Sequence, residues 1–182
     1  MILGASEIFK LINEKGTIKN IDDYDFEIEG TTVDLRLDEV YLVDRSSEID
    51  LFVESRRTAK IKKVESEEDV QGRELFVLEP GCIYLVNTIE EVDTPKNIYI
   101  DVKPRTTLFR SCLMLLASGV NPGYKGKLTF GLANFMGTPV LIERGFRICQ
   151  LVFHEIKGDC ALYKGNWQGG KITSNGEFDP AR

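Results

Sequence analysis

The chain has 182 residues, of which 42% are hydrophobic and 29% are charged, and this composition predicts one globular domain that needs no disulfide framework. Its 23 Lys and Arg residues against 29 Asp and Glu residues give a net charge of −6, which argues against a DNA or RNA partner because phosphate contacts need clustered basic residues. A small phosphorylated ligand in a local basic pocket is compatible with this balance.

A short amphipathic helix is predicted at the start of the chain. Ser6 is a suitable N-cap, and Ile8, Leu11 and Ile12 recur with the spacing of one helix face. Gly16 follows as the expected C-terminal stop.

Short strands are predicted over most of the remaining chain. Apolar residues alternate with polar ones or form short runs, and turn residues such as Pro80-Gly81 and Asn121-Pro122-Gly123 separate them. The predicted strands are residues 33–37, 75–78, 82–86, 98–102, 128–132, 140–142 and 147–153. Many short strands at this spacing favour an all-β barrel or jelly roll.

Two segments depart from the strand pattern. Residues 54–73 carry a basic half followed at once by an acidic half, which predicts an exposed strand pair or loop rather than a nucleic-acid surface. The tail from Tyr163 contains four glycines, and we expect it to be mobile until something orders it.

Metal-ligating and membrane-directed patterns are missing from the sequence. The four Cys residues are not paired as C-x-x-C and His154 is the single histidine, so no Cys/His zinc site is predicted. No basic segment precedes an apolar stretch at the N-terminus, and no window reaches the roughly 18 consecutive apolar residues of a membrane span. We therefore expect a cytoplasmic protein without a membrane partner.

Two polar clusters are candidates for chemistry. Residues 103–111 hold Arg105 and Arg110 beside threonine hydroxyls, groups that suit phosphate oxygens, although an ion-paired loop on a barrel rim is the alternative. Residues 117–126 hold glycines that allow close approach of a ligand and a tyrosine that can stack on a sugar or base, although an ordinary hairpin is the alternative. Asp34 and Arg36 alternate with apolar neighbours and are interpreted as a structural ion pair.

These clusters belong to a series of seven segments that together resemble one protein family. The segments are Met1-Ile2-Leu3 with its helix, 31–37 (TTVDLRL), 79–90 (EPG to TIE), 105–110 (RTTLFR), 121–126 (NPGYKG), 145–151 (GFRICQL) and 163–170 (YKGNWQGG). In this order, over nearly the whole length, the chain resembles the dCTP deaminase and dUTPase superfamily, and more closely its deaminase branch.

The resemblance implies a distorted jelly roll, the β-clip-like dUTPase fold with a short N-terminal helix, assembled as a homotrimer. Residues 1–162 would form the β domain, and residues 163–182 a flexible arm that closes over the site. The ligands would be dCTP, dUTP or dTTP, bound between subunits, with Mg²⁺ on the triphosphate and no dedicated protein ligands for the metal.

Carried over position by position, the resemblance also names site residues. The triphosphate or pyrimidine would contact residues of the arginine cluster, the base would contact the backbone of the following turn, and Tyr124 would pack on the deoxyribose and exclude a 2′-hydroxyl. The full set is Arg105, Thr106, Thr107, Arg110, Ser118, Gly119, Val120, Tyr124, Gln150, Tyr163, Lys164, Gln168 and Lys171.

Two positions depart from the family pattern. Gly131 stands where the deaminases carry the glutamate that moves protons, and Asn121 stands where the diphosphatases carry the aspartate that activates water. Asn121 could still position a water, and Asp101 is a possible substitute carboxylate. Two hypotheses follow: a hydrolase that converts dCTP to dUTP, or dUTP to dUMP and pyrophosphate, through a non-standard site, or a weakly active or inactive nucleotide-binding relative that acts as a sensor or regulatory protein.

Overall fold

The computed structural model describes residues 1–22 and 30–180. Helix α1 (Ala5–Asn13) buries Ile8, Leu11 and Ile12, as predicted. The predicted cap was wrong: Gly4 is the N-cap and has no side-chain cap bond. The Gly4 carbonyl already accepts hydrogen bonds from the backbone N–H groups of Glu7 and Ile8, so the helix begins before Ser6.

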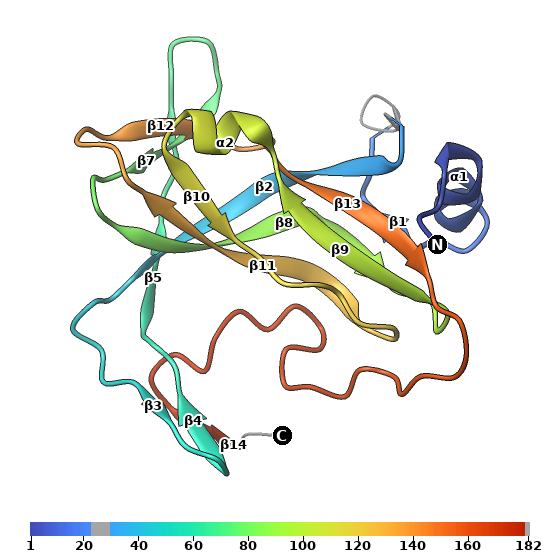
Figure 1. Cartoon of the computed structure of the whole chain (residues 1–182). Coiled ribbons are helices and arrows are strands. Elements are labelled where there is room, and N and C mark those ends of the chain that lie inside the picture. The colour runs from blue at the N-terminus through green and yellow to red at the C-terminus, as the bar shows by residue number, and fades with distance from the viewer. Residues whose placement is uncertain (23–29, 181–182) are drawn as a thin grey trace.

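The main sheet is antiparallel and contains eight strands (Figure 1). Its central path runs in the order β10-β11-β8-β2-β13-β9, with β1 paired to β8 and β5 paired to β2. The strands are β1 (Ile18–Lys19), β2 (Thr32–Val43), β5 (Ile61–Val64), β8 (Ile83–Asp93), β9 (Ile98–Pro104), β10 (Leu113–Leu116), β11 (Lys125–Asn134) and β13 (Arg147–Glu155). The all-β prediction is confirmed, and α2 (Thr106–Arg110) adds one short helix where a loop was expected.

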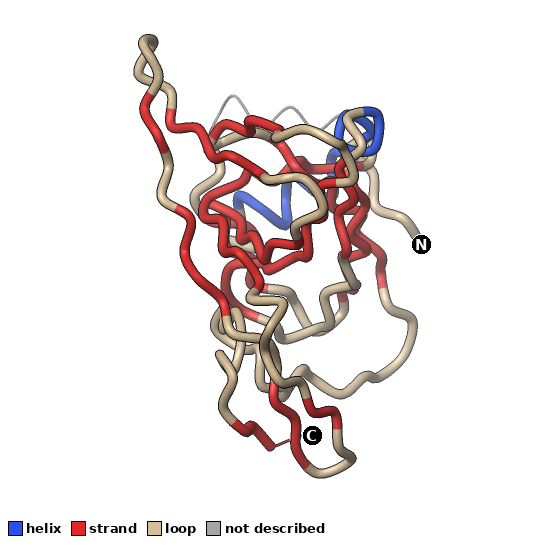
Figure 2. Tube along the Cα trace, turned by 90° about the vertical axis from the view of Figure 1, so that its left-hand side faces the viewer, coloured by secondary structure: helices blue, strands red, loops and turns tan. Residues whose placement is uncertain are grey.

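The sheet curls until its two edges almost meet (Figure 2). Register shifts in the β2–β8, β8–β11 and β2–β13 pairs mark bulges, which bend strands and increase their twist. An isolated bridge between Ile100 of β9 and Val120, just after β10, joins the opposite edges of the path. This bridge fixes the turn that follows β10 against the far side of the barrel.

Two small sheets extend from the barrel. One contains β6 (Glu67–Glu68), β7 (Glu74–Leu78) and β12 (Val140–Glu143). The other contains β3 (Asp50–Leu51), β4 (Ser55–Arg57) and β14 (Phe178–Pro180), so the end of the tail pairs with a hairpin from the first third of the chain (Figure 1).

Among the described residues, no helix has the length and apolar character needed to cross a bilayer.

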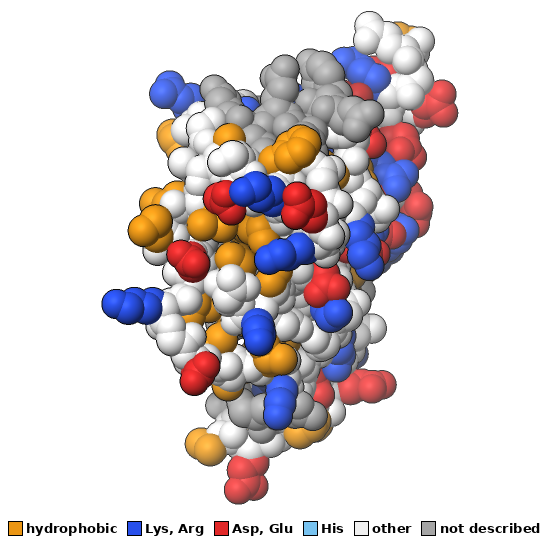
Figure 3. Space-filling model, turned by 90° about the vertical axis from the view of Figure 1, so that its right-hand side faces the viewer, with side chains coloured by type: hydrophobic (Ala, Val, Ile, Leu, Met, Phe, Trp, Pro, Cys, Tyr) orange, Lys and Arg blue, Asp and Glu red, His pale blue; other side chains and the backbone are white. Residues whose placement is uncertain are grey.

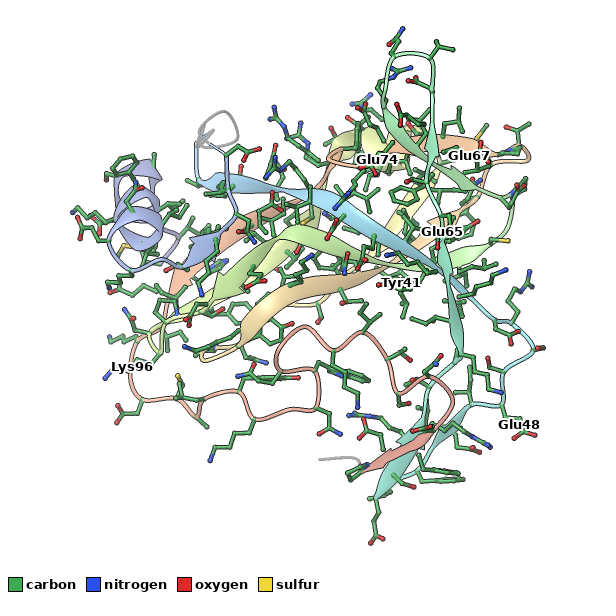
Figure 4. All side chains as sticks on the ribbon, turned by 180° about the vertical axis from the view of Figure 1, so that it is seen from behind. Tyr41, Glu48, Glu65, Glu67, Glu74 and Lys96 are labelled. Carbon is green, nitrogen blue, oxygen red and sulfur yellow. The ribbon has the colours of Figure 1, made fainter. Side chains whose placement is uncertain are left out.

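The charged segment 54–73 forms strands and loops, as predicted, and several of its charged side chains form ion pairs. Arg57 contacts Glu48 and Asp50, and Lys63 contacts Glu39 at 2.7 Å. Figure 4 shows Glu48, the partner of Arg57, toward one end of the molecule and Glu67 toward the other, with Glu65 between them, so the segment runs along the molecule. On the face seen in Figure 3, Lys and Arg lie beside Asp and Glu rather than in a patch of one sign.

Glu90 is a fully buried carboxylate in the barrel interior and lies against Arg36. Glu90 accepts hydrogen bonds from Nε of Arg36 at 2.6 Å and from the Arg36 backbone N–H at 2.9 Å. Burial raises the pKa of Glu90, and the hydrogen bonds from Arg36 oppose that rise. The predicted partner of Arg36 was wrong, because Arg36 contacts Glu90 and Asp34 instead contacts Arg105 and Arg147.

We predict that Arg36→Met destabilises the fold by about 3–5 kcal/mol, because it leaves the Glu90 carboxylate buried without its cation. Arg36→Met combined with Glu90→Gln is expected to cost clearly less, since no charge is then buried. Urea unfolding at one fixed protein concentration measures both. Equal losses for the single and double variants would contradict the buried ion pair.

Candidate functional site

A cavity of about 390 Å³ lies between the end of the barrel and the C-terminal tail. One wall comes from the turn after β10 and from β11, and the other comes from the tail, which crosses below β11 in Figure 1. The lining residues are Leu85, Ser118, Gly119, Val120, Asn121, Tyr124, Leu128, Thr129, Phe130, Gly131, Tyr163, Trp167, Lys171 and Ile172.

The turn after β10 is held from behind by Tyr99. A Cβ built on Gly119 would lie 1.7 Å from Oη of Tyr99, so the tyrosine ring occupies the place of a side chain. Val120 exchanges backbone hydrogen bonds with Ile100 at 2.8 and 3.1 Å. Gly119 therefore permits the close approach of Tyr99, rather than of a ligand as predicted. The backbone of the turn still lines the cavity.

Tyr124 forms a rigid part of the cavity wall. Its hydroxyl donates to the Lys127 carbonyl at 2.6 Å, and its ring packs edge-on against Tyr163 at 5.5 Å between centroids. The side chain is buried, and burial raises the pKa of Tyr124 to about 12. The phenol therefore stays protonated near neutral pH and serves as a packing surface rather than a base.

The tail packs against the turn of residues 121–126, where β11 begins. Gln168 accepts from the Lys125 backbone N–H at 3.0 Å and donates to the Gly123 carbonyl at 2.9 Å. The Gly169 N–H donates to the Lys125 carbonyl at 2.9 Å. A Cβ on Gly126 would lie 2.6 Å from the Gly170 nitrogen, so only a glycine allows the two backbones to touch.

Among the described lining residues there is no Asp, Glu or His. Gly131 faces the cavity from the middle of β11, and a Cβ there would lie 3.2 Å from Cβ of Leu116 on β10. A longer side chain at position 131 would therefore require Leu116 to move. Hydroxyls, the Asn121 amide, backbone groups and the Lys171 amine are the polar groups that this cavity offers.

The arginine cluster lies elsewhere in the same chain. Arg105 is the N-cap residue of α2, and its guanidinium contacts Asp34, which also contacts Arg147 at 3.3 Å. Thr106, Thr107 and Arg110 are exposed on α2. None of these α2 residues lines the cavity. Within a single chain, the arginine cluster predicted to bind phosphate and the turn predicted to bind the base therefore lie in separate places.

The comparisons with known proteins agree with this architecture. Residues 2–156 match the family model described as dCTP deaminase-like. The chain belongs to the dCTP deaminase-like family. It is 31% identical to the dCTP deaminase of Halorubrum lacusprofundi over 174 residues, covering 94% of this chain and 85% of that protein. It is 33% identical to the dUMP-forming dCTP deaminase of Dictyoglomus thermophilum over 159 residues, covering 86% of this chain and 81% of that protein.

A solved structure supports the fold independently. The 2′-deoxycytidine 5′-triphosphate deaminase of Agrobacterium tumefaciens superposes with a TM-score of 0.61 at 21% sequence identity. The match covers 84% of this chain but 46% of that one, so the present chain spans less than half of the solved protein. At this identity the superposition establishes a shared fold.

Other predicted site residues, including the possible substitute carboxylate Asp101, lie outside the cavity. Gln150 on β13 lies 3.4 Å from the Thr32 hydroxyl, and Asp101 on β9 forms an ion pair with Lys103 at 2.7 Å. Lys164 is exposed, and Gln168 holds the tail rather than facing the cavity. No group of three or more His, Cys, Asp or Glu residues that could hold a metal occurs in the parts of the chain that the structure describes.

Sequence reasoning missed several lining residues. Leu85 and Ile172 carry no signal beyond apolar character, and their place depends on tertiary packing. Trp167 carries a clearer signal, because it is the single tryptophan of the chain and stands within a glycine-containing segment.

We predict that Gly126→Ala lifts the tail away from the hairpin, because its Cβ would overlap the Gly169–Gly170 backbone and position 126 has a φ of +128°. Trypsin cleavage after Lys164 and Lys171 should become faster, as followed by mass spectrometry. Gly81→Ala is the matched control, since Gly81 also has positive φ but nothing lies within 4 Å of its Cβ position. Equal cleavage rates in the two variants would contradict the seating of the tail.

Proposed function

We propose that the chain is a deoxypyrimidine nucleoside triphosphate hydrolase that cleaves the phosphate chain in preference to deaminating the base. The observation that carries this proposal is the chemistry of the cavity. Deamination needs a group that repeatedly gives and takes protons at the ring, and loss of such a group costs on the order of 100- to 10,000-fold in rate. The described cavity wall offers no carboxylate or imidazole for that work.

Phosphate hydrolysis makes smaller demands on these side chains. Asn121 is exposed at the cavity and would orient a water by hydrogen bonding, although its amide cannot act as a base at neutral pH. Mg²⁺ carried by the nucleotide would supply charge stabilisation and acidity. Asn121 and Lys171 line the cavity and would contact such a ligand near its phosphates, whereas Asp101 is already paired with Lys103.

The same absence of a proton-transfer group favours a second candidate function. A chain that keeps the Tyr124 wall and the closed tail but turns over slowly would act as a nucleotide-binding protein, such as a sensor or regulatory relative. Product release separates the two functions, because both require binding of a deoxypyrimidine triphosphate and only the hydrolase consumes it.

The phosphate end of the ligand requires residues of a second copy in this proposal. Arg110 is exposed on α2 and makes no side-chain hydrogen bond or ion pair within the described chain, and the cavity lies elsewhere on the subunit. A homotrimer would place α2 of one subunit beside the cavity of the next, so that Arg110 and Thr106 face the phosphates. The binding site would then be formed between subunits.

Product analysis tests the reaction. With dUTP and Mg²⁺, we expect pyrophosphate and dUMP, and with dCTP we expect no ammonia above the background rate. Chromatography of the nucleotides together with an ammonia assay measures both. Binding without any product would favour the regulatory function. Rapid ammonia release from dCTP would contradict the proposal that the site cleaves the phosphate chain in preference to deaminating the base.

Subunit mixing tests where the arginine acts. We predict that Arg110→Gln and Asn121→Ala are each inactive alone, and that co-assembly of the two variants restores about a quarter of the sites, because some interfaces then pair an intact Arg110 with an intact Asn121. As the control, the two variants are assembled separately and then mixed without subunit exchange, and no activity should be recovered. Absence of recovery in co-assembled protein would show that the two residues act within one chain.

A further inference from the structure

The tail of this chain carries its single tryptophan between two cations. Cζ of Arg56 lies 4.6 Å from the centroid of the Trp167 ring, and Nζ of Lys171 lies 5.9 Å from it. Trp167 and Lys171 line the cavity, whereas Arg56 belongs to β4 in the hairpin outside the barrel. One aromatic ring therefore connects the cavity wall to that hairpin.

The guanidinium of Arg56 lies over the ring of Trp167 and makes few other contacts. Nε of Arg56 is buried and donates to none of the described groups, and Nη2 lies 3.8 Å from Oδ2 of Asp179. A partly buried guanidinium with so few hydrogen bonds gains its main stabilisation from the aromatic face. Lys171 also contacts Asp179, at 3.1 Å, so this carboxylate holds both cations beside the ring.

The hairpin is fastened to the tail along its length. Arg56 and Asp179 are opposite each other in the β4–β14 pair, and Arg57 lies over the ring of Phe178 at 4.9 Å. Beyond β4, the hydroxyl of Thr58 lies 2.7 Å from that of Thr173 and 2.8 Å from that of Ser174. Residues 56–58 therefore contact the tail both before its last turn, at residues 173–174, and after it, at residues 178–179.

We propose that the hairpin of residues 50–57 is a clamp that holds the tail over the cavity, and that Arg56 is a positioning residue for the ligand site, acting through Trp167. The inference rests on the proposed function, because it takes the cavity as the nucleotide site. Without the guanidinium, Trp167 loses its contact with the hairpin. A cation–π contact of this kind corresponds to roughly 2- to 30-fold in ligand affinity.

Three variants isolate the contact. Arg56→Gln removes the cation, Arg56→Lys keeps a cation of different shape, and Arg45→Gln removes one positive charge at an exposed position with no partner among the described residues. Acrylamide quenching of Trp167 fluorescence is measured without nucleotide. We expect stronger quenching in Arg56→Gln, intermediate quenching in Arg56→Lys, and unchanged quenching in Arg45→Gln.

Ligand binding is then measured with dUTP and Mg²⁺ by equilibrium dialysis. Arg56→Gln is expected to raise the Kd roughly 2- to 30-fold, and to raise KM more than it lowers kcat if turnover is observed, with the thermal transition of the barrel unchanged. Arg56→Lys should recover part of the affinity, and Arg45→Gln should bind as the unmodified chain does.

Two results would overturn the clamp: quenching of Trp167 that is the same in Arg56→Gln and the unmodified chain, or quenching that is the same in Arg56→Gln and Arg56→Lys. A Kd unchanged by Arg56→Gln would overturn the positioning role. Failure of the unmodified chain to bind dUTP or dCTP would refute the proposed function and the positioning role with it, and the quenching measured without nucleotide would still decide whether the clamp exists.

Discussion

A direct contact between two stretches of backbone determines the shape of the candidate site. Gly126 lies so close to Gly169 and Gly170 that no side chain fits between them. This contact brings the tail against the hairpin of β11, and Tyr163 and Trp167 reach the cavity as a consequence. Without it, the turn after β10 would be an open surface at the end of a barrel.

The electrostatics of the chain divide into two zones. The cavity is lined by apolar, aromatic and neutral polar side chains with one amine, while carboxylates are absent from the described lining and several of them pair with arginines elsewhere, as in the Arg105–Asp34 contact. A mostly uncharged cavity wall suits an uncharged pyrimidine ring and sugar, and the exposed Arg110 of α2 suits phosphate. This division explains why the proposed site needs two copies of the chain.

The strands were predictable because their signals are local. Alternation along β2 and β11, and turn residues such as Pro80-Gly81, depend on neighbours a few positions away. The position of the tail depends on contacts between distant residues, such as Lys125 with Gln168, 43 positions apart, and no local pattern specifies them. The helix cap was missed for a different, local reason: the helix begins at Ala5, so Ser6 lies inside it, and the Gly4 carbonyl accepts the first backbone hydrogen bonds without a side-chain cap.

The site was predictable only in part. The family motif around residues 118–124 indicated the turn that lines the cavity, and the missing acid at Gly131 was visible in the sequence. The roles of Trp167 and Arg56 were not visible, because the β3–β4 hairpin and the tail meet only in the folded chain.

The central claim is that the cavity beneath the tail holds a deoxypyrimidine nucleotide. Titration of Trp167 emission with dUTP, and with UTP for comparison, in the presence of Mg²⁺ tests it most directly. The account predicts a saturable change with dUTP at lower concentration than with UTP, because in the proposed site the Tyr124 ring would pack on the deoxyribose and would exclude a 2′-hydroxyl. An emission spectrum that neither dUTP nor dCTP alters, together with no protection of the tail from trypsin, would contradict it.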